Sequence, residues 1–362
     1  MHRELRSTVI AGVGALALGL VVIVILFYGA RTASTRIAAL IKTLGDPDAK
    51  VRCNAAGALG KIGPGAREAV PGLIKALGDP DAEVRKTATL ALGEIGREAK
   101  DAVPALINTL GDPNAFVRMA AAIVLGKIGP EAKEAVPALI KVLEDADASV
   151  RALAADALGQ IGLEAKKAVP ALIKALGDPE AHVRDLAAVA LGVIGPEAKE
   201  AVPALIKALG DPEGQVRAGA AAALGEIGPE AKDAVPVLIK ALGDTDAQVR
   251  EGAASALGGI GPDAKEAIPA LIRTLGDPVV DVRLVAARVL FRISPQAKEA
   301  LAVLINALGD PAVDVRGSAA FALGDIGPRA REAIPELERL ADKDPDIRIR
   351  RTAHRAVEKI RK

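Results

Sequence analysis

Residues 195–227 decide the fold, and they read GPEAKEAVPALIKALGDPEGQVRAGAAAALGEI. The chain repeats this 33-residue unit from near residue 34 to its end. A Val-Arg pair marks the successive copies, with the valine at Val51, Val84, Val117, Val150, Val183, Val216, Val249, Val282 and Val315. The last copy, Ile349-Arg350, is shifted by one position because residues 336–343 carry one extra residue. A fixed period in this range is typical of a solenoid.

Each unit carries two apolar patterns with helical spacing. In residues 195–227 the first pattern is Val202, Leu205, Ile206 and Leu209, and the second is Val216, Ala220, Leu224 and Ile227. Both place apolar groups along one stripe of a helix. Pro203 interrupts the first pattern, so we expect either a kink there or a short turn over residues 197–201 followed by a new helix.

A turn signal, Gly210-Asp211-Pro212, separates the two patterns. We expect Gly210 to end the first helix in the left-handed conformation and Asp211 to cap the second helix. One helical pair cannot bury its apolar stripe alone, whereas stacked neighbours can. The sequence therefore predicts an all-α solenoid of about ten two-helix repeats, with the first helices outside and the second helices lining a concave face.

The recurring string P-A-L-I-K-A-L-G-D-P…V-R…A-A-x-A-L-G-x-I-G resembles HEAT repeats, in particular the short bacterial kind also found in phycobilisome lyases. The resemblance covers about nine tenths of the chain. It is specific for the fold and nearly silent on function. It implies that the turn Asp and the Arg after Val form an internal ladder that links neighbouring units, at Asp46, Arg52, Asp79, Arg85, Asp112, Arg118, Asp211, Arg217 and their copies.

The first thirty residues have a different character. Residues 1–7 form a short basic tail, and residues 8–30 run without a charge as TVIAGVGALALGLVVIVILFYGA. This run exceeds the roughly 20 residues that cross a bilayer, and it is longer than the apolar core of a signal peptide. We expect an uncleaved single-pass anchor ahead of a solenoid over residues 31–362. A basic tail before an apolar run favours a solenoid outside the cytoplasm, although the flanking charges barely discriminate.

Composition and motifs predict no catalysis. The histidines are His2, His182 and His354, the only cysteine is Cys53, and no metal-ligand spacing or phosphate-binding loop occurs. We therefore expect no enzyme activity, no metal and no cofactor. The net charge of +1 gives no general attraction to nucleic acid. The arginines of the ladder could bind phosphate, but their recurrence beside aspartates favours a structural role.

Four rows of the second helices vary from copy to copy, at positions equivalent to 215, 218, 222 and 226. This spacing places them on one helix face, away from the core stripe. We expect this face to bind a protein or peptide where apolar residues gather on it: Leu90, Phe116, Met119, Ile123, Leu153, Leu186, Val189 and Val193. The competing interpretation is sequence drift on an unconstrained surface.

The C-terminal repeat presents a basic face made of Arg348, Arg351, Arg355 and Lys359. A solvated end cap explains it, and so would an acidic partner or a lipid headgroup. The sequence thus favours a membrane-anchored, non-catalytic scaffold for a protein or peptide partner. The resemblance to the lyases keeps open an enzyme-accessory protein that acts on a chromophore or a protein substrate, and the arginine ladder keeps open a nucleic-acid binder.

Overall fold

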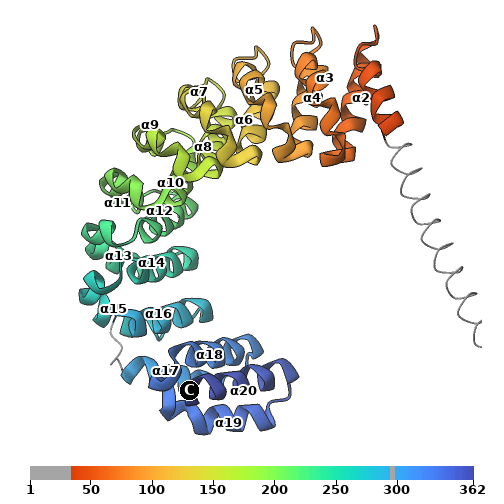
Figure 1. Cartoon of the computed structure of the whole chain (residues 1–362). Helices are drawn as coiled ribbons and strands as arrows, with labels where there is room; N and C mark the ends of the chain where they lie inside the picture. Colours follow the sequence, from red (N-terminus) through yellow and green to blue (C-terminus); the bar gives the residue numbers. More distant parts are fainter. Residues whose placement is uncertain (1–33, 294–297) are drawn as a thin grey trace, which may run out of the picture. The chain divides into compact units, whose positions relative to one another are not determined.

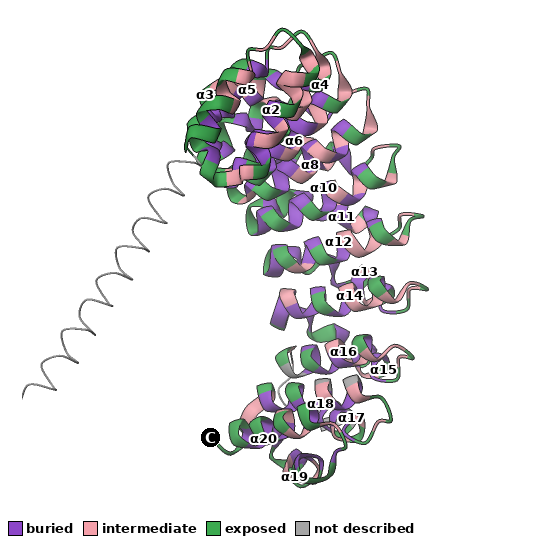
Figure 2. Ribbon diagram, turned by 90° about the vertical axis from the view of Figure 1, so that its right-hand side faces the viewer, coloured by how far each residue is buried: buried purple, intermediate pink, exposed green. Residues whose placement is uncertain are grey.

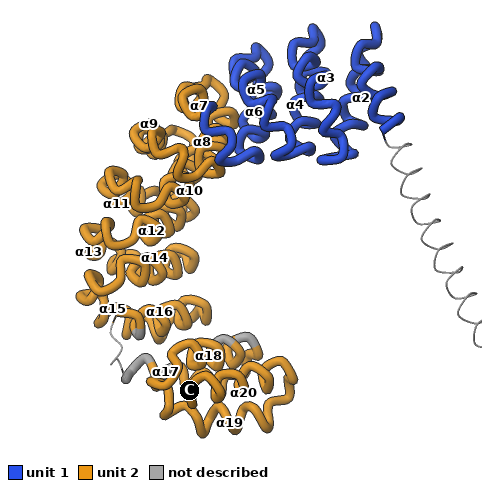
Figure 3. Tube along the Cα trace, viewed as in Figure 1, with its two compact units in different colours: residues 1–135 blue, residues 136–362 orange. Residues whose placement is uncertain are grey.

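The computed structural model describes residues 34–293 and 298–362. The basic tail and the expected membrane anchor, residues 1–7 and 8–30, lie outside the described residues. Within the described ranges, none of the helices is both long and apolar enough to cross a bilayer. The described chain is all-α, and it divides into two compact units between Ala135 and Val136 (Figure 3).

Every regular repeat consists of three pieces. In the repeat that begins at residue 195 they are the 3-10 helix η5 (Gly195–Ala201), the α-helix α11 (Val202–Ala208) and the α-helix α12 (Gly214–Ile227) (Figure 1). Pro203 lies in the first turn of α11, where its missing N–H costs no hydrogen bond. Of the two structures expected around this proline, the turn followed by a new helix is therefore the one that forms.

Unit 1 begins with a helix over residues 34–43. Three second helices follow, and the short helices of the first layer lie between and after them. Its elements are α2 (Ala49–Ile62), η1 (Gly63–Ala69), α3 (Val70–Ala76), α4 (Ala82–Ile95), η2 (Gly96–Ala102), α5 (Val103–Thr109), α6 (Ala115–Ile128) and η3 (Gly129–Ala135).

Unit 2 continues the same order from Val136. Its second helices are α8 (Ala148–Ile161), α10 (Ala181–Ile194), α12, α14 (Ala247–Ile260), α16 (Val280–Ile293), α18 (Val313–Ile326) and α20 (Ile347–Arg361). The first-helix layer consists of α7 (Val136–Val142), η4 (Gly162–Ala168), α9 (Val169–Ala175), η5, α11, η6 (Gly228–Ala234), α13 (Val235–Ala241), η7 (Gly261–Ala267), α15 (Ile268–Thr274), α17 (Lys298–Ala307), η8 (Gly327–Ala333) and α19 (Ile334–Lys343). In this unit the second helices lie on the inner side of the curve (Figure 3).

The predicted apolar stripe of the second helix is the core. Val216, Ala220, Leu224 and Ile227 are all 0% exposed. Buried residues recur along the second helices (Figure 2). The first helix adds Val202, Leu205 and Leu209, which are also buried, whereas Ile206 is only half-buried. Burial of branched side chains in every repeat supplies the stacking free energy of the solenoid.

Two expectations about the turns are wrong. Gly210 does not have a positive φ; the glycine that does is Gly228, at φ 75° and ψ −138°, where α12 ends and η6 begins. Asp211 does not cap α12, which starts three residues later behind Glu213. The chain leaves the first helix through a tight turn in which Gly210 N donates to Lys207 O at 3.0 Å, and this turn needs no left-handed residue.

Three positions before each positive-φ glycine stands a second glycine, which lies inside a second helix and not in a turn. Gly192 lies inside α10, and a Cβ built on it would stand 3.0 Å from Ala223 Cα on α12. Small residues at this position let consecutive second helices approach closely. The sequence pattern therefore combines a helix-packing glycine with a helix-terminating one.

Candidate functional site

An arginine-aspartate ladder runs along the turns of each unit. In unit 1, Arg52 Nε and Nη2 donate to the two carboxylate oxygens of Asp79 at 2.6 and 2.7 Å. Arg52 Nη1 also donates to the main-chain oxygen of Asp46, at 2.9 Å. Each rung thus ties one repeat to the carboxylate of the next and to its own turn.

The same geometry recurs between Arg85 and Asp112 in unit 1 and between Arg151 and Asp178, Arg184 and Asp211, Arg217 and Asp244, Arg250 and Asp277, and Arg316 and Asp344 in unit 2. Arg283 is the exception, because its Nη2 lies 3.9 Å from Asp310. Arg118 Nη1 donates to Asp112 O at 2.9 Å within its own turn. The last rung spans one residue more than the others because residues 336–343 carry one extra residue.

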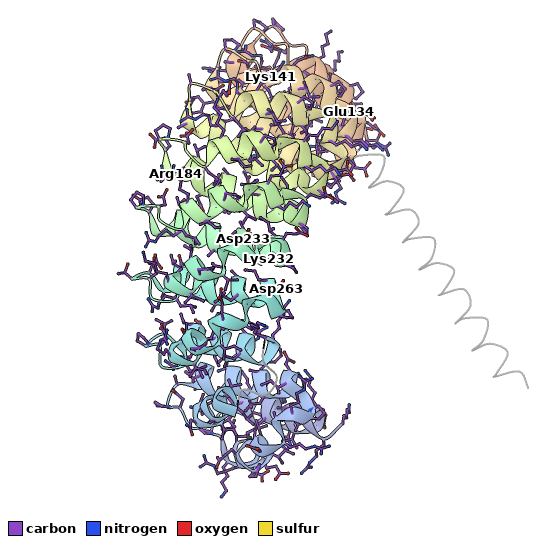
Figure 4. The ribbon with its side chains drawn as sticks, turned by 90° about the vertical axis from the view of Figure 1, so that its left-hand side faces the viewer. Glu134, Lys141, Arg184, Lys232, Asp233 and Asp263 are labelled. Atoms are coloured by element: carbon purple, nitrogen blue, oxygen red, sulfur yellow. The ribbon has the colours of Figure 1, made fainter. Side chains whose placement is uncertain are left out.

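Each ladder carboxylate serves the turn as well as the arginine. Asp79 Oδ1 accepts the main-chain N–H of Asp81 at 2.9 Å, as an aspartate at the start of a turn does. Hydrogen bonds from the Arg52 guanidinium lower the pKa of Asp79, against the opposite effect of burial. In these rungs the guanidinium groups face carboxylates rather than solvent. Figure 4 shows Arg184 at the turns, whereas Lys232, Asp233 and Asp263 lie on η6 and η7.

Three of the four variable rows face solvent, whereas the fourth is buried or half-buried at every described position except Arg351. The row of Phe116 and the row of Lys127 are exposed at nearly every described position. The row of Val189 is exposed at nearly every described position of unit 2. The row of Met119 lies between consecutive second helices: Ala152 is 2% exposed, Asp185 6% and Leu284 8%. The expectation that all four rows lie on the free surface is therefore wrong for this row.

In unit 1 the predicted binding residues gather on α4 and α6. Phe116 is 64% exposed and Leu90 40%, while Met119 and Ile123 are half-buried beside them. Phe116 is held in the first turn of α6, where its N–H donates to the Asn114 side chain at 2.9 Å. Two ion pairs flank this unit 1 patch: Lys86 with Glu83 at 2.6 Å, and Lys127 with Glu94 at 2.9 Å. An apolar centre with a charged rim is the usual composition of an interaction surface.

In unit 2 the predicted residues lie on α8 and α10. Val189 is 43% and Val193 57% exposed, and Leu153 and Leu186 are half-buried. Beside them on α8, Gln160 donates to Asp156 at 2.6 Å. The predicted binding residues are thus divided between the two units, with the larger exposed side chain in unit 1.

The basic face lies at the C-terminal end of unit 2, and two of its residues form ion pairs. Arg348, Arg351, Arg355 and Lys359 are all exposed. Arg348 pairs with Asp346 at 2.6 Å, and Lys359 pairs with Asp325 at 3.0 Å. Lys359 Nζ also lies 5.5 Å from the centre of the Phe321 ring. Phe321, 54% exposed, is missing from the predicted set although it occupies the same variable row as Ile123 and Val189.

Residues 34–293 and 298–362 contain no group of three or more His, Cys, Asp or Glu side chains that could hold a metal ion. The Cys53 thiol lies 3.2 Å from the Thr87 hydroxyl at a contact between α2 and α4. His182 is exposed.

The two-helix repeats match the model of one family, HEAT repeats, over residues 37–101, 72–143, 136–214, 202–291 and 301–362. The chain belongs to the HEAT-repeat family. Among solved structures, an engineered protein is 29% identical, with a TM-score of 0.57 over 90% of this chain and 99% of that one. Importin beta is 18% identical, with a TM-score of 0.62 over 89% of this chain and 50% of that one.

Another solved structure, the Kap95:Nup1 complex, is 15% identical, with a TM-score of 0.60 over 90% of this chain and 51% of that one. This HEAT-repeat chain thus spans about half the length of these natural proteins, and the likeness to them is one of fold. No curated protein matches the chain.

Proposed function

We propose that this HEAT-repeat chain is a membrane-anchored, non-catalytic scaffold that binds a protein or peptide on the exposed face of its second helices. The observation that carries the proposal is the exposed Phe116 side chain in the unit 1 patch. The chain has only four phenylalanines, and 64% exposure of one of them places an apolar ring in water at a site rimmed by ion pairs. Apolar surface of this kind is stabilised when a partner covers it.

Two further features support protein binding over the alternatives. The guanidinium groups of the ladder arginines already donate hydrogen bonds to Asp carboxylates and turn carbonyls, so they are poorly placed to bind phosphates. The solved structures with the same fold include a Kap95:Nup1 complex. We also propose that the repeats are HEAT repeats of the short bacterial kind, which the recurring PALIKALGDP string supports.

The anchor rests on residues 8–30, an uncharged run of 23 residues. Alkaline carbonate extraction of native membranes tests it: the full chain should stay in the pellet. Leu20→Arg places a charge near the middle of the run, where it costs about 3 kcal/mol of insertion free energy, and should shift the chain toward the soluble fraction. Protease protection in intact cells tests the proposed extracytoplasmic side of the solenoid. Release of the unchanged chain by carbonate would contradict the anchor.

The partner surface is tested by site-specific photo-crosslinking in the native host. A photoreactive phenylalanine analogue replaces Phe116 in one variant and Asn108 in another. Asn108 is exposed on α5, in the other helix layer of the same repeat, so it controls for access and expression. We expect a discrete crosslinked protein at position 116 and not at 108. The same product from both positions, or none from either, would contradict the proposed surface.

A further inference from the structure

The last repeats of unit 2 surround a hollow with three arginines. Arg288 and Arg292 come from α16 and Arg329 from η8, and all three are exposed. The hollow has a volume of about 370 Å³, and its apolar floor includes Val289 and Ala322, at 6% and 1% exposure. In the described part of the chain none of the three arginines makes an ion pair. They therefore differ from the ladder arginines, whose charge is neutralised within the fold.

Among the described residues that line this hollow, the one carboxylate already has a partner. Asp325 Oδ1 accepts from Lys359 Nζ at 3.0 Å, so it offers Arg288, Arg292 and Arg329 little compensation. Three guanidinium groups that line one hollow and have no ion-pair partner among the described residues repel one another, and a ligand that brings carboxylates would relieve that repulsion. The hollow is thus complementary to an acidic group.

A second hollow of about 400 Å³ adjoins the first, because Arg288 lines both. Its wall contains the exposed ring of Phe321 and the carboxylates of Glu251 and Asp281. The ring offers a stacking or apolar contact beside the cationic hollow. The carboxylates set a limit on the ligand, because a chain with a negative charge at every step would place some of those charges against Glu251 and Asp281.

We propose that this surface, the Arg288–Arg292–Arg329 hollow with Phe321 beside it, binds a short acidic peptide segment of a partner protein. Acidic side chains enter the first hollow, and an apolar side chain packs on Phe321 in the second. A peptide fits better than a nucleic acid, whose regular phosphates would meet Glu251 and Asp281. It also fits better than a lipid surface, because α16 and α18 lie on the inner side of the curve of unit 2, where a flat bilayer has poor access (Figure 3).

This proposal goes beyond the scaffold function argued above, because it assigns a second, charge-selective site that uses none of the residues of the unit 1 patch. The two can fail separately. Phe116→Asp should leave binding of an acidic peptide unchanged, and loss of the arginines should leave crosslinking at position 116 unchanged.

The test is fluorescence anisotropy with the full chain in detergent. The probe is a labelled peptide with a run of glutamates followed by phenylalanine. Two comparison peptides replace either the glutamates with glutamine or the phenylalanine with glycine. At about 0.15 M salt, where long-range attraction is screened, we expect the glutamate peptide to bind at least about tenfold more tightly than the glutamine peptide. Phe321→Ala should weaken binding of the phenylalanine peptide and not of the glycine one.

The deciding variant is the triple substitution Arg288→Gln, Arg292→Gln and Arg329→Gln. Its matched control changes three other exposed arginines, Arg97→Gln, Arg273→Gln and Arg331→Gln, and so lowers the net charge equally. We expect about a tenfold loss of glutamate-peptide affinity in the first triple and less than twofold in the second. Equal affinities in the two triples would overturn the proposal. So would a loss confined to binding of single-stranded DNA or of anionic vesicles.

Discussion

Arg250 and Asp277 lie 27 residues apart in the sequence, yet both oxygens of the Asp277 carboxylate accept hydrogen bonds from Arg250, at 2.7 Å from Nε and 3.0 Å from Nη2. The side chains are 12% and 7% exposed. Arg250 Nη1 donates in addition to Asp244 O at 2.9 Å. One side chain thus joins the turn of its own repeat to the turn of the next.

We predict that Arg250→Ala lowers the free energy of unfolding by about 3 kcal/mol, because removing one partner leaves the other charge in a nearly solvent-free site. Arg273→Ala is the control, since Arg273 is exposed on α15 in the same unit. Urea unfolding followed by circular dichroism measures the difference. Superimposable curves for the two variants would show that the rung adds no stability.

The stability contributed by this rung should depend on pH. The hydrogen bonds from Arg250 lower the pKa of Asp277 in the folded chain. A carboxyl whose pKa is lower when folded stabilises the fold above its unfolded pKa of about 3.9, and that stability is lost as the pH falls through the folded value. Asp277→Asn should therefore destabilise the chain fully at pH 7 and progressively less below about pH 4. A destabilisation that is independent of pH would contradict this account.

Asp185 is predicted to behave in the opposite way. It is 6% exposed on α10, burial raises its pKa, and the Gln215 amide donates to its carboxylate at 2.6 Å. A raised folded pKa means that the fold favours the protonated carboxyl, so its contribution is greatest at low pH and is lost as the pH rises through the folded value. Asp185→Asn keeps an acceptor for Gln215 without the charge, and it should raise the free energy of unfolding at pH 7. The difference from wild type should shrink toward pH 4, and a less stable variant at pH 7 would refute the assignment.

The two kinds of turn glycine should respond differently to substitution. Gly228→Ala forces a side chain into the positive-φ conformation and should cost about 1–3 kcal/mol. Gly210→Ala needs no such conformation, and the added Cβ would meet Lys207 O at an ordinary 3.4 Å. We expect it to change the midpoint of thermal unfolding much less. Equal shifts for the two variants would contradict the turn geometry.

The periodic features of this fold could be predicted from the sequence, and the local turn geometry could not. The apolar spacing of Val216, Ala220, Leu224 and Ile227 indicates the buried stripe directly, because only that face is shared by every repeat. Gly210 and Gly228 both follow a helix, so composition alone could not show which of them has the positive φ. From its position in the sequence, Asp211 resembles a helix cap. Its carboxylate instead accepts a hydrogen bond from Arg184, 27 residues earlier.

The candidate surfaces were predictable only in part. Exposure of Phe116 and Val193 follows from their helix face, whereas burial of the row of Met119 follows from how closely consecutive second helices approach, as at Gly192 and Ala223. The hollow around Arg288 is formed by residues from α14, α16, α18 and η8 together. No single repeat contains that arrangement, so a comparison of repeats could not reveal it.

The most direct test of the scaffold account is the dissociation constant of the crosslinked partner for wild type, Phe116→Asp and Asn108→Asp. Both variants add one negative charge to an exposed position of the same repeat, on opposite helix layers. If Phe116 anchors the partner, Phe116→Asp should cost at least about 2 kcal/mol, a loss of about 30-fold, while Asn108→Asp stays within about twofold. Equal affinity for all three chains would contradict the claim that the second-helix face of unit 1 binds the partner.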